Sequence, residues 1–541
     1  MNEQPVQTGN PPLLEAPLPA SNRSRRARRT RRQPYNWLGT GVLGVGVLGV
    51  GIGVALIGGA GVASADSNSG AGIGSTARAG GSSAGSSPGA DRSAAASLAR
   101  PAAAATAATA TRRQTMAPRP RNARAAAVKA SSAPAYPSYR VGGATVTLSQ
   151  ILDTVASDVG ITGVRGAGGR NVVLTGIGCG QQRTECNPDS LPITPSKALL
   201  FVGSVDNNTA TGTSYLLTPT FPGVVVTSSE FYGPNTRRYN PNLIPAGSVE
   251  AVGVYTAGED ADTRTRGMMY LGPPNGVGGT WTQLDVPSDG TNTVGKVSAC
   301  AGQGPSCSVW DTYPHSTMGN LVVGAYDLTK DGISSDTKTG NGFIYNKATQ
   351  QFTLLGSPGG LFGSDGLQNG NSVYGVWQNG GQHSDIYTMV GGTGQPVQGI
   401  EQQAYIVTYN AATGQFSTPK TFTYLNTGQN THFEGINPVP GGFAVSAESG
   451  PGERGQQASV AFIPAIGLGR WGLGQGNIRY GEAKWLPLEV PFCTGGKCAF
   501  TSDDTVYGNK VFGIYLSSGS TQTSTYMATL TGRFGGPLWY L

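Results

Sequence analysis

Short hydrophobic runs with a shared internal pattern recur over residues 200–515 of the chain. Each run has five residues, mostly Val, Phe, Tyr or Ala, and five of the six runs have Gly at the third position. The runs are residues 201–205, 251–255, 322–326, 373–377, 443–447 and 511–515. Runs of this length that are rich in β-branched and aromatic residues favour strands over helices. The pattern therefore predicts six related β-strands.

A second apolar run follows each of these cores after a polar loop, and a third follows in four repeats. The second runs are residues 213–217, 267–271, 342–345, 404–407, 458–462 and 524–527, and the third are 281–284, 351–354, 421–424 and 484–488. Gly-Asn precedes three cores, at 319–320, 370–371 and 508–509. Because Gly-Asn suits a tight hairpin turn, a further strand is expected before the core. Each repeat thus supplies about four strands.

This succession of antiparallel strands predicts the fold class. Four-stranded units repeated around a ring give an all-β β-propeller, here with about six four-stranded blades, in which radial closure protects the sheet edges. A tandem of β-sandwiches is the alternative, but each sandwich would need about 100 residues. The unit, a Gly-Asn turn followed by V-V-G-x-Y, G-F-x-Y and F-T-x-L, resembles the HAF-type extracellular repeats of bacterial proteins. The resemblance implies a propeller and carries no catalytic residues.

One helix is expected ahead of the repeats, over residues 147–159. Its apolar face is formed by Leu148, Ile151, Leu152, Val155 and Val159. Thr147 and Gln150 form a capping box, and Gly160 can end the helix. We expect the apolar face to pack on the propeller, with partner binding as the alternative.

The composition excludes several other classes of protein. Of the 541 residues 84 are Gly and only 12% are charged, so the chain is neither a coiled coil nor a highly charged disordered protein. The Gly residues lack the three-residue period of collagen. The net charge of +7 comes from residues 1–138, which carry 16 basic and four acidic residues, whereas residues 139–541 carry 21 and 26. Nothing in this distribution indicates a nucleic-acid partner for the folded part.

The first 65 residues have the organisation of a secretory signal peptide. Seven Arg between Arg23 and Arg32 precede a charge-free stretch that ends in Ala-Ser-Ala at residues 63–65, before Asp66. A basic segment, an apolar segment and small residues at the cleavage site are the three parts of such a signal. An uncleaved membrane anchor over residues 37–62 is the alternative. The leader resembles those of exported mycobacterial and related actinobacterial proteins, which implies a secreted or cell-envelope location.

Residues 66–138 form a different kind of segment, made of Ala, Ser, Gly, Thr and Pro with scattered Arg. It has too few large apolar residues to offset the entropy of ordering, so we expect a disordered linker. The propeller domain is then residues 139–541.

Six cysteines fall into three close pairs, and each pair lies ahead of a repeat core. The pairs are Cys179 with Cys186, Cys300 with Cys307, and Cys493 with Cys498. In an exported chain this spacing predicts three local disulfides. Zinc is the alternative, but no C-x2-C and no His at ligand spacing accompany the pairs.

The acidic residues ahead of the cores are the candidates for chemistry. Asp311, Asp365, Glu434 and Asp503 lie 10 to 13 residues before the central positions of their cores. Such carboxylates could line a central channel and bind a cation or sugar hydroxyls, and a pair could act as acid and base of a glycosidase. His315 and His432 lie in the same segments and add titratable groups. Turn residues on solvated rims explain the acids equally well.

Together these features predict an exported propeller that acts as a binding or scaffolding module, with a glycan or a protein at the cell surface as its ligand. A carbohydrate-active hydrolase that uses the channel carboxylates is the alternative, and a purely structural envelope protein is a third interpretation. We expect no cofactor, with a structural cation left open. Contact with a membrane is expected only through residues 37–62, if they are not removed.

Overall fold

The computed structural model describes most of the region that follows the linker. The described residues are 138–141, 143–150, 159–178, 196–206, 209–257, 264–300, 306–329, 341–355, 371–393, 403–426, 430–450, 457–468, 478–492, 498–517, 523–533 and 538–539. The predicted signal peptide and most of the predicted linker lie outside them. Within these ranges no helix is long and apolar enough to cross a membrane.

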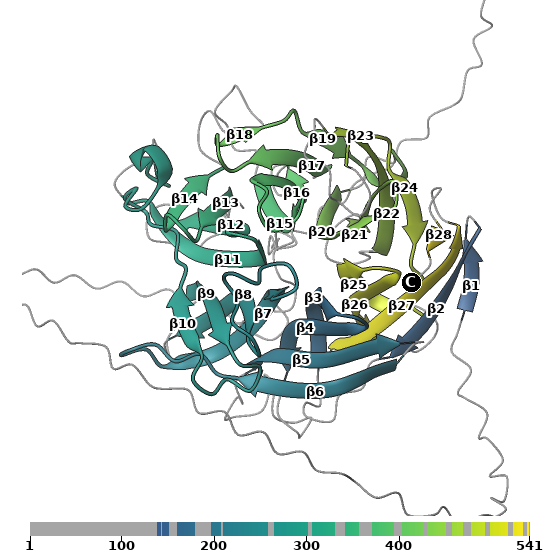
Figure 1. Ribbon diagram of the computed structural model, residues 1–541, viewed down its shortest axis with the longest axis horizontal. Coiled ribbons are helices and arrows are strands. Elements are labelled where there is room, and N and C mark those ends of the chain that lie inside the picture. The colour runs from purple at the N-terminus through teal and green to yellow at the C-terminus, as the bar shows by residue number, and fades with distance from the viewer. Residues whose placement is uncertain are drawn as a thin grey trace, which may run out of the picture. The chain divides into compact units, whose positions relative to one another are not determined.

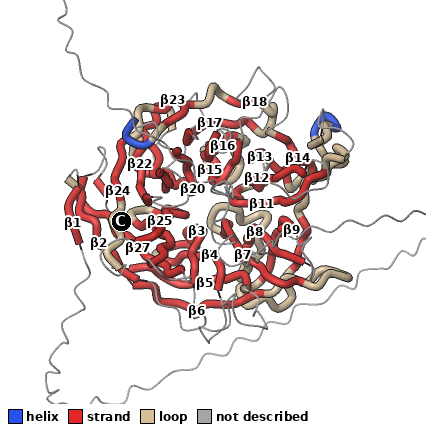
Figure 2. Tube along the Cα trace, turned by 180° about the vertical axis from the view of Figure 1, so that it is seen from behind, coloured by secondary structure: helices blue, strands red, loops and turns tan. Residues whose placement is uncertain are grey.

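The described strands form five sheets, arranged as in a propeller (Figure 1). One four-stranded sheet has the order β3 (Val159–Gly168), β4 (Asn171–Gly178), β5 (Lys197–Asp206), β6 (Thr209–Leu217). Another has the order β10 (Thr280–Gln283), β9 (Arg264–Gly272), β8 (Val249–Ala257), β7 (Val226–Thr236). The helical elements among the described residues are two short 3-10 helices, η1 (Val294–Lys296) and η3 (Tyr424–Asn426), and all the others are strands (Figure 2). The predicted all-β class and propeller arrangement are confirmed.

The largest sheet has nine strands. It runs β11 (Ser308–Met318), β12 (Leu321–Thr329), β13 (Asn341–Asn346), β15 (Asn371–Gln378), β16 (Ile386–Thr393), β17 (Gln403–Asn410), β18 (Gln415–Phe416), with β14 (Gln351–Leu354) on β13 and β19 (Lys420–Phe422) on β17. Its two halves are joined by a single parallel pair, Asn341 with Asn371. This junction, together with the five- and six-stranded sheets, means that the prediction of about six separate four-stranded blades is not reproduced.

The remaining two sheets complete the ring. The five-stranded sheet runs β20 (Asn430–Val439), β21 (Gly442–Gly450), β22 (Gln457–Ile466), β23 (Arg479–Tyr480), with β24 (Lys484–Pro487) on β22. The six-stranded sheet runs β1 (Ser138–Val141), β2 (Ala144–Gln150), β27 (Thr523–Arg533), β26 (Lys510–Ser517), β25 (Cys498–Tyr507), with β28 (Leu538–Trp539) on β27. Because β2 pairs with β27, the first described strands and the last close the ring within one sheet.

The predicted helix over residues 147–159 is wrong at both ends. Thr147 to Gln150 belong to β2, and Val159 begins β3, while residues 151–158 lie outside the described part. The physical reason is visible in β2, where Ala144, Val146 and Leu148 are fully buried in alternation. This is the period of a strand with one face in a core. Its partner β27 lies nearly 400 residues away, so the local pattern did not reveal the pairing.

The repeated Gly-centred cores all lie in strands, but not in equivalent ones. Counted outwards from the centre, four of the strands that contain a core are second in their sheets: β8, β12, β21 and β26. The core in β5 lies in the third strand, and the core in β15 lies in the innermost strand. At Gly253 and Gly324 the glycine is required by close approach. A Cβ there would lie 2.0 Å from the carbonyl oxygen of Glu230 and 2.1 Å from that of Tyr313, respectively. The motif therefore marks strands that pack tightly against a neighbour.

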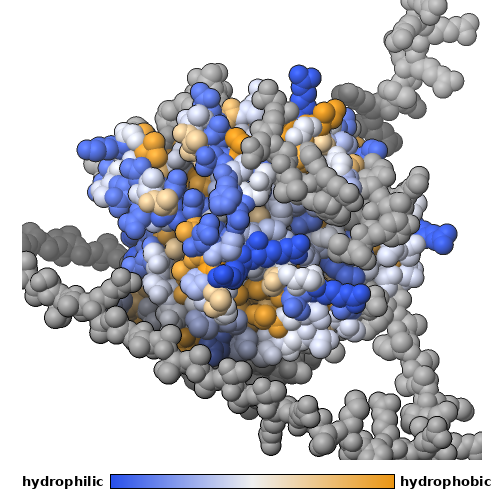
Figure 3. Space-filling view, in the orientation of Figure 1, coloured by the Kyte–Doolittle hydropathy of each residue, from blue (hydrophilic) through white to orange (hydrophobic). Residues whose placement is uncertain are grey.

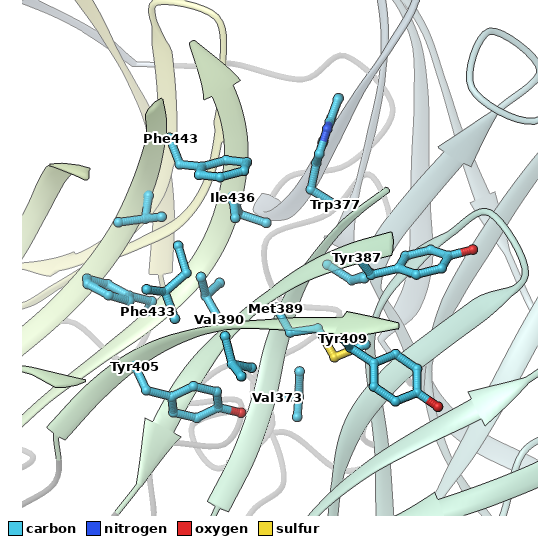
Figure 4. Close-up of a cluster of buried hydrophobic side chains, with 14 of the residues drawn as sticks. Val373, Trp377, Tyr387, Met389, Val390, Tyr405, Tyr409, Phe433, Ile436 and Phe443 are labelled. Carbon is cyan, nitrogen blue, oxygen red and sulfur yellow. The ribbon is translucent and has the colours of Figure 1, made fainter. Parts of the chain in front are cut away.

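Hydrophobic side chains fill the spaces between neighbouring sheets. In the largest cluster Phe433 and Ile436 of β20 pack with Met389 and Val390 of β16, and all four are at most 1% exposed (Figure 4). Burying each such side chain stabilises the fold by roughly 1.5–3 kcal/mol relative to leaving it in water. Because these contacts connect adjacent sheets, they hold the innermost strands at the centre.

Candidate functional site

The innermost strands of the sheets meet at the centre of the propeller (Figures 1 and 2). Each contacts the next in a closed ring, in the order β3, β7, β11, β15, β20, β25 and back to β3. Each of the six also has a register shift with its antiparallel partner near its middle. The shifts lie between Ile161 and Gly163, Phe231 and Gly233, Pro314 and Ser316, Val373 and Gly375, Phe433 and Ile436, and Ser502 and Thr505.

The side chains of the unpaired residues in these bulges line one central cavity, which we call the hub. A bulge leaves its extra residue unpaired and re-aims the side chain. One such residue from each strand lines the hub: Thr162, Tyr232, His315, Tyr374, Glu434 and Asp504. The hub has a volume of about 20 Å³. By the usual criterion this is room for a single water or a cation of similar size.

One side of the hub is aromatic. The His315 ring stacks on Tyr232 with ring centroids 4.4 Å apart, and it meets the edge of Tyr374 at 4.6 Å. Burial, together with a smaller effect of the charge of His432, lowers the pKa of His315 to about 3. His315 is therefore neutral at physiological pH. Its Nε2 atom and the Tyr232 hydroxyl have no hydrogen-bond partner among the described residues.

The opposite side is acidic and centres on His432. Its Nε2 atom lies 2.7 Å from Glu434 Oε1 and 3.4 Å from Glu448 Oε2. Burial lowers the pKa of His432, but the hydrogen bond and the charges of Glu434 and Glu448 outweigh this effect and raise it above its ordinary value. Burial raises the pKa of Glu448 to about 7, although the charge of His432 opposes the shift. The group thus keeps an imidazole and two carboxyl groups in contact away from solvent.

Ser502 connects this group to a second pair of acids. Its hydroxyl donates to Glu448 Oε1 and lies 2.8 Å from Asp504 Oδ1. One hydroxyl proton cannot serve both carboxylates, so the arrangement favours a proton or a cation on one of them. Burial raises the pKa of Asp504 well above its ordinary value. Burial also raises the pKa of Asp503, whose Oδ1 accepts a hydrogen bond from the Tyr526 hydroxyl.

Arg165 supplies a positive charge to the hub. The side chain is 5% exposed and lines the cavity. Its Nη2 atom donates to the backbone oxygen of Val376 at 2.9 Å and to Ser316 Oγ at 3.2 Å. The guanidinium also lies over the Trp377 ring, 5.8 Å from its centroid. Burial lowers the pKa of Arg165 to about 10, so the group stays charged at neutral pH.

The structure brings only some of the sequence-derived candidates together. His315 and Glu434 line the hub, and His432 contacts Glu434. Asp503 is buried beside the hub-lining Asp504 but contacts Tyr526 instead. Asp311 lies apart from the hub, where its carboxylate accepts hydrogen bonds from the Thr265 amide at 2.8 Å and the Tyr313 hydroxyl at 3.0 Å. Asp365 lies outside the described residues.

Several hub residues were not among the candidates. Asp504 follows directly after a candidate, and only the bulge of β25 determines that it, and not Asp503, lines the cavity. Glu448, which lies beside the hub, comes one residue after the repeat core of residues 443–447, a position that Asp206 and Asp327 occupy in two other repeats. Tyr232, Tyr374 and Arg165 were missed too. The signal that could have found Tyr374 is its place in a predicted strand, the repeat core of residues 373–377.

The cysteine predictions can be followed for one pair in full. Cys300 and Cys307 form a disulfide with a Cα–Cα distance of 5.6 Å. Cys498 is also disulfide-bonded, while Cys493, its predicted partner, lies outside the described residues. Cys179 and Cys186 lie outside them as well.

Comparison with known proteins yields distant structural likenesses only. No protein-family model and no curated protein matches the sequence. A protein of unknown function from Dyadobacter fermentans has a TM-score of 0.40 at 11% identity, covering 73% of this chain and 100% of its own. The α-L-arabinanase of Penicillium chrysogenum, complexed with arabinobiose, has a TM-score of 0.35 at 10% identity, covering 72% and 98%.

A third likeness is to Zg3597, a family 117 glycoside hydrolase produced by Zobellia galactanivorans. It has a TM-score of 0.31 at 10% identity and covers 72% of this chain and 90% of its own. All three TM-scores are below 0.5, so the likenesses carry no information on the activity of this chain.

Proposed function

We propose that this protein is an exported, non-catalytic propeller that binds a glycan or a protein on its outer loops and acts as a binding or scaffolding module. The observation that carries the proposal is the size of the hub. At about 20 Å³ it is far below the roughly 300–1,000 Å³ of pockets that hold organic ligands. A ligand larger than a water or an ion therefore has to bind elsewhere, on the loops that join the strands.

A carbohydrate hydrolase is the second candidate, because the hub carboxylate Glu434 and the neighbouring carboxylate Glu448 have a suitable separation. Ligand atoms of Glu434 and Glu448 lie within 4.8 Å of each other and of His432. Retaining glycosidases hold two carboxyl groups about 5 Å apart. However, a sugar ring has to reach both groups, and the cavity beside Glu434 has no room for one. The geometry thus favours binding over turnover.

The disulfide supports the proposed location outside the cytoplasm. Disulfides persist in oxidising compartments and are rare in the cytosol. The Cys300–Cys307 bond agrees in this respect with the signal-like residues 1–65. We therefore propose a secreted or envelope-associated protein.

The segment before this disulfide is the best-defined candidate for a contact surface. It contains η1, which stands at the periphery near β14 (Figure 2). The Phe352 amide donates to the Asn292 backbone oxygen at 2.8 Å and fixes the segment to β14. Val294 and Val297 are 52% and 40% exposed. A fixed loop that exposes two apolar side chains can bind a partner with little loss of entropy.

The wider surface suits recognition of a polar ligand. On the face shown in Figure 3, hydrophilic residues predominate and hydrophobic ones lie between them. Surfaces of this kind bind through dispersed polar contacts around a few apolar anchors. We take Val294 and Val297 as such anchors.

Two binding assays on the full exported chain test the proposal. An array of bacterial envelope polysaccharides measures glycan binding, and cross-linking mass spectrometry detects binding to envelope proteins. Wild-type protein is expected to bind one class, and Val294→Asp with Val297→Asp to weaken that binding at least about tenfold, as loss of anchor residues does. Val225→Asp, at a side chain 69% exposed elsewhere, is the matched control. If the Val294→Asp/Val297→Asp variant bound as tightly as the Val225→Asp control, this loop would not be the contact surface. Release of sugars by wild-type protein would favour the hydrolase.

A further inference from the structure

We propose that a single divalent cation, Zn²⁺ by preference, also binds at the edge of the hub, through His432 Nε2 and the carboxylates of Glu434 and Glu448, of which only Glu434 lines the cavity. The three ligand atoms lie within 4.8 Å of one another. They come from two adjacent strands, since His432 and Glu434 belong to β20 and Glu448 to β21, where it pairs directly with His432. Strand pairing, and not a mobile loop, thus positions the ligands.

The distances suit a small cation. Bonds of about 2.1 Å at tetrahedral angles separate two ligand atoms by roughly 3.4 Å. His432 Nε2 and Glu448 Oε2 are 3.4 Å apart, and the 2.7 Å contact of His432 with Glu434 has to open by several tenths of an ångström. Glu434 lines the hub, whose volume of about 20 Å³ admits an ion or one water. A mixed set of imidazole and carboxylate ligands favours Zn²⁺ over Ca²⁺, which prefers oxygen alone.

Two buried polar atoms in the hub point independently to a bound species. Tyr232 is 4% and His315 is 8% exposed, and both line the cavity. The Tyr232 hydroxyl and His315 Nε2 have no hydrogen-bond partner among the described residues. Buried polar groups are nearly always satisfied, so a water or an ion is expected beside them. One water in the hub, bound to a cation that sits at the edge beside Glu434, supplies such a partner.

The charges around the site require compensation as well. Glu448 and Asp504 share the hydroxyl of Ser502, and Glu434 lies on the same side of the hub. Burying several carboxylates together is unfavourable unless a cation or protons neutralise them. Arg165 is the hub's guanidinium, and among the described residues it donates hydrogen bonds to Ser316 and to the backbone oxygens of Val164 and Val376. A divalent cation supplies the missing positive charge where the ligands already converge.

The test uses the full exported chain after dialysis against EDTA. ZnCl₂, MnCl₂ and CaCl₂ are titrated separately by calorimetry, and the thermal midpoint is recorded with each metal. We expect one Zn²⁺ per chain, a raised midpoint, and binding at least about tenfold weaker in Glu448→Gln. Glu482→Gln, whose side chain is 88% exposed and pairs with Lys420, is the control and should bind as wild type does.

Three results would overturn the proposal: no saturable Zn²⁺ binding, tighter binding of Ca²⁺ than of Zn²⁺, or equal affinity in the two variants. If Glu448→Gln does not fold, X-ray absorption spectroscopy at the zinc edge identifies the atoms bound to Zn²⁺ in the wild-type protein and tests the assignment. A first shell of one imidazole nitrogen with oxygens supports the assignment, and a shell with sulfur or without imidazole refutes it. Loss of this metal site would leave the proposed surface binding standing, because the two use different residues.

Discussion

Glu230 gives the sharpest test of how the inner strands are buried. The residue lies in β7, two positions before the hub-lining Tyr232, and is 2% exposed. Neither carboxylate oxygen has a hydrogen-bond partner among the described residues, and burial raises the pKa to about 8 from an ordinary value of 4.5. The folded protein therefore holds a proton that the unfolded chain releases. Folding stability should fall as the pH rises from 4.5 and level off above 8.

Glu230→Gln removes this dependence while keeping the shape of the protonated acid. A pKa raised from 4.5 to about 8 corresponds to at most about 5 kcal/mol of lost stability above pH 8, at 1.36 kcal/mol per unit. We expect the variant to match wild type near pH 4 and to exceed it by a few kcal/mol at pH 9.

Urea unfolding of both proteins between pH 4 and 9 measures this difference, and Glu489→Gln, at an exposed side chain, is the control. A difference between Glu230→Gln and wild type that does not change with pH would refute the reasoning.

Two further sets of substitutions test what stabilises the fold: a disulfide and a tightly packed glycine. Cys300→Ser with Cys307→Ser should lower the free energy of unfolding by about 2 kcal/mol relative to wild type, the loop-entropy value for so short a loop. Urea unfolding of both proteins under non-reducing conditions measures this difference. An equal stability with and without reductant in wild type would contradict it. Gly253→Ala places a methyl group 2.0 Å from the Glu230 carbonyl oxygen and should cost more than about 2 kcal/mol. Gly278→Ala meets no atom within 4 Å and costs only the strain of its φ of 74°, about 1 kcal/mol, so it should cost less. The reverse order would be incompatible with the close packing of β7 on β8.

The local pattern was sufficient for strands but not for their places in the sheets. Residues 251–255 and 322–326 were predicted as strands and lie in β8 and β12. The same motif at residues 373–377 forms the innermost β15, because Val, Gly and aromatic residues suit any strand buried on both faces. The helix prediction failed for the complementary reason: Leu148 faces a core that residues far along the chain complete.

The hub was predictable only in part because its geometry depends on bulges. A bulge is a mismatch between two paired strands, so it cannot be detected in one strand alone. Glu434 was found from its offset to a repeat core and His315 from its place in the same segment as Asp311, yet Asp311, at a similar offset, lies outside the cavity. Glu448 joins the group only because its strand pairs with β20 in a register that places it opposite His432.

The central claim is that the hub does not process an organic substrate and that larger ligands bind at the surface. The most direct measurement is the release of reducing ends from the envelope polysaccharide that the protein binds, followed over hours with wild-type protein and with Glu434→Gln. The account predicts binding by both proteins and no release above background by either. Release by wild-type protein that is lost in Glu434→Gln would contradict it.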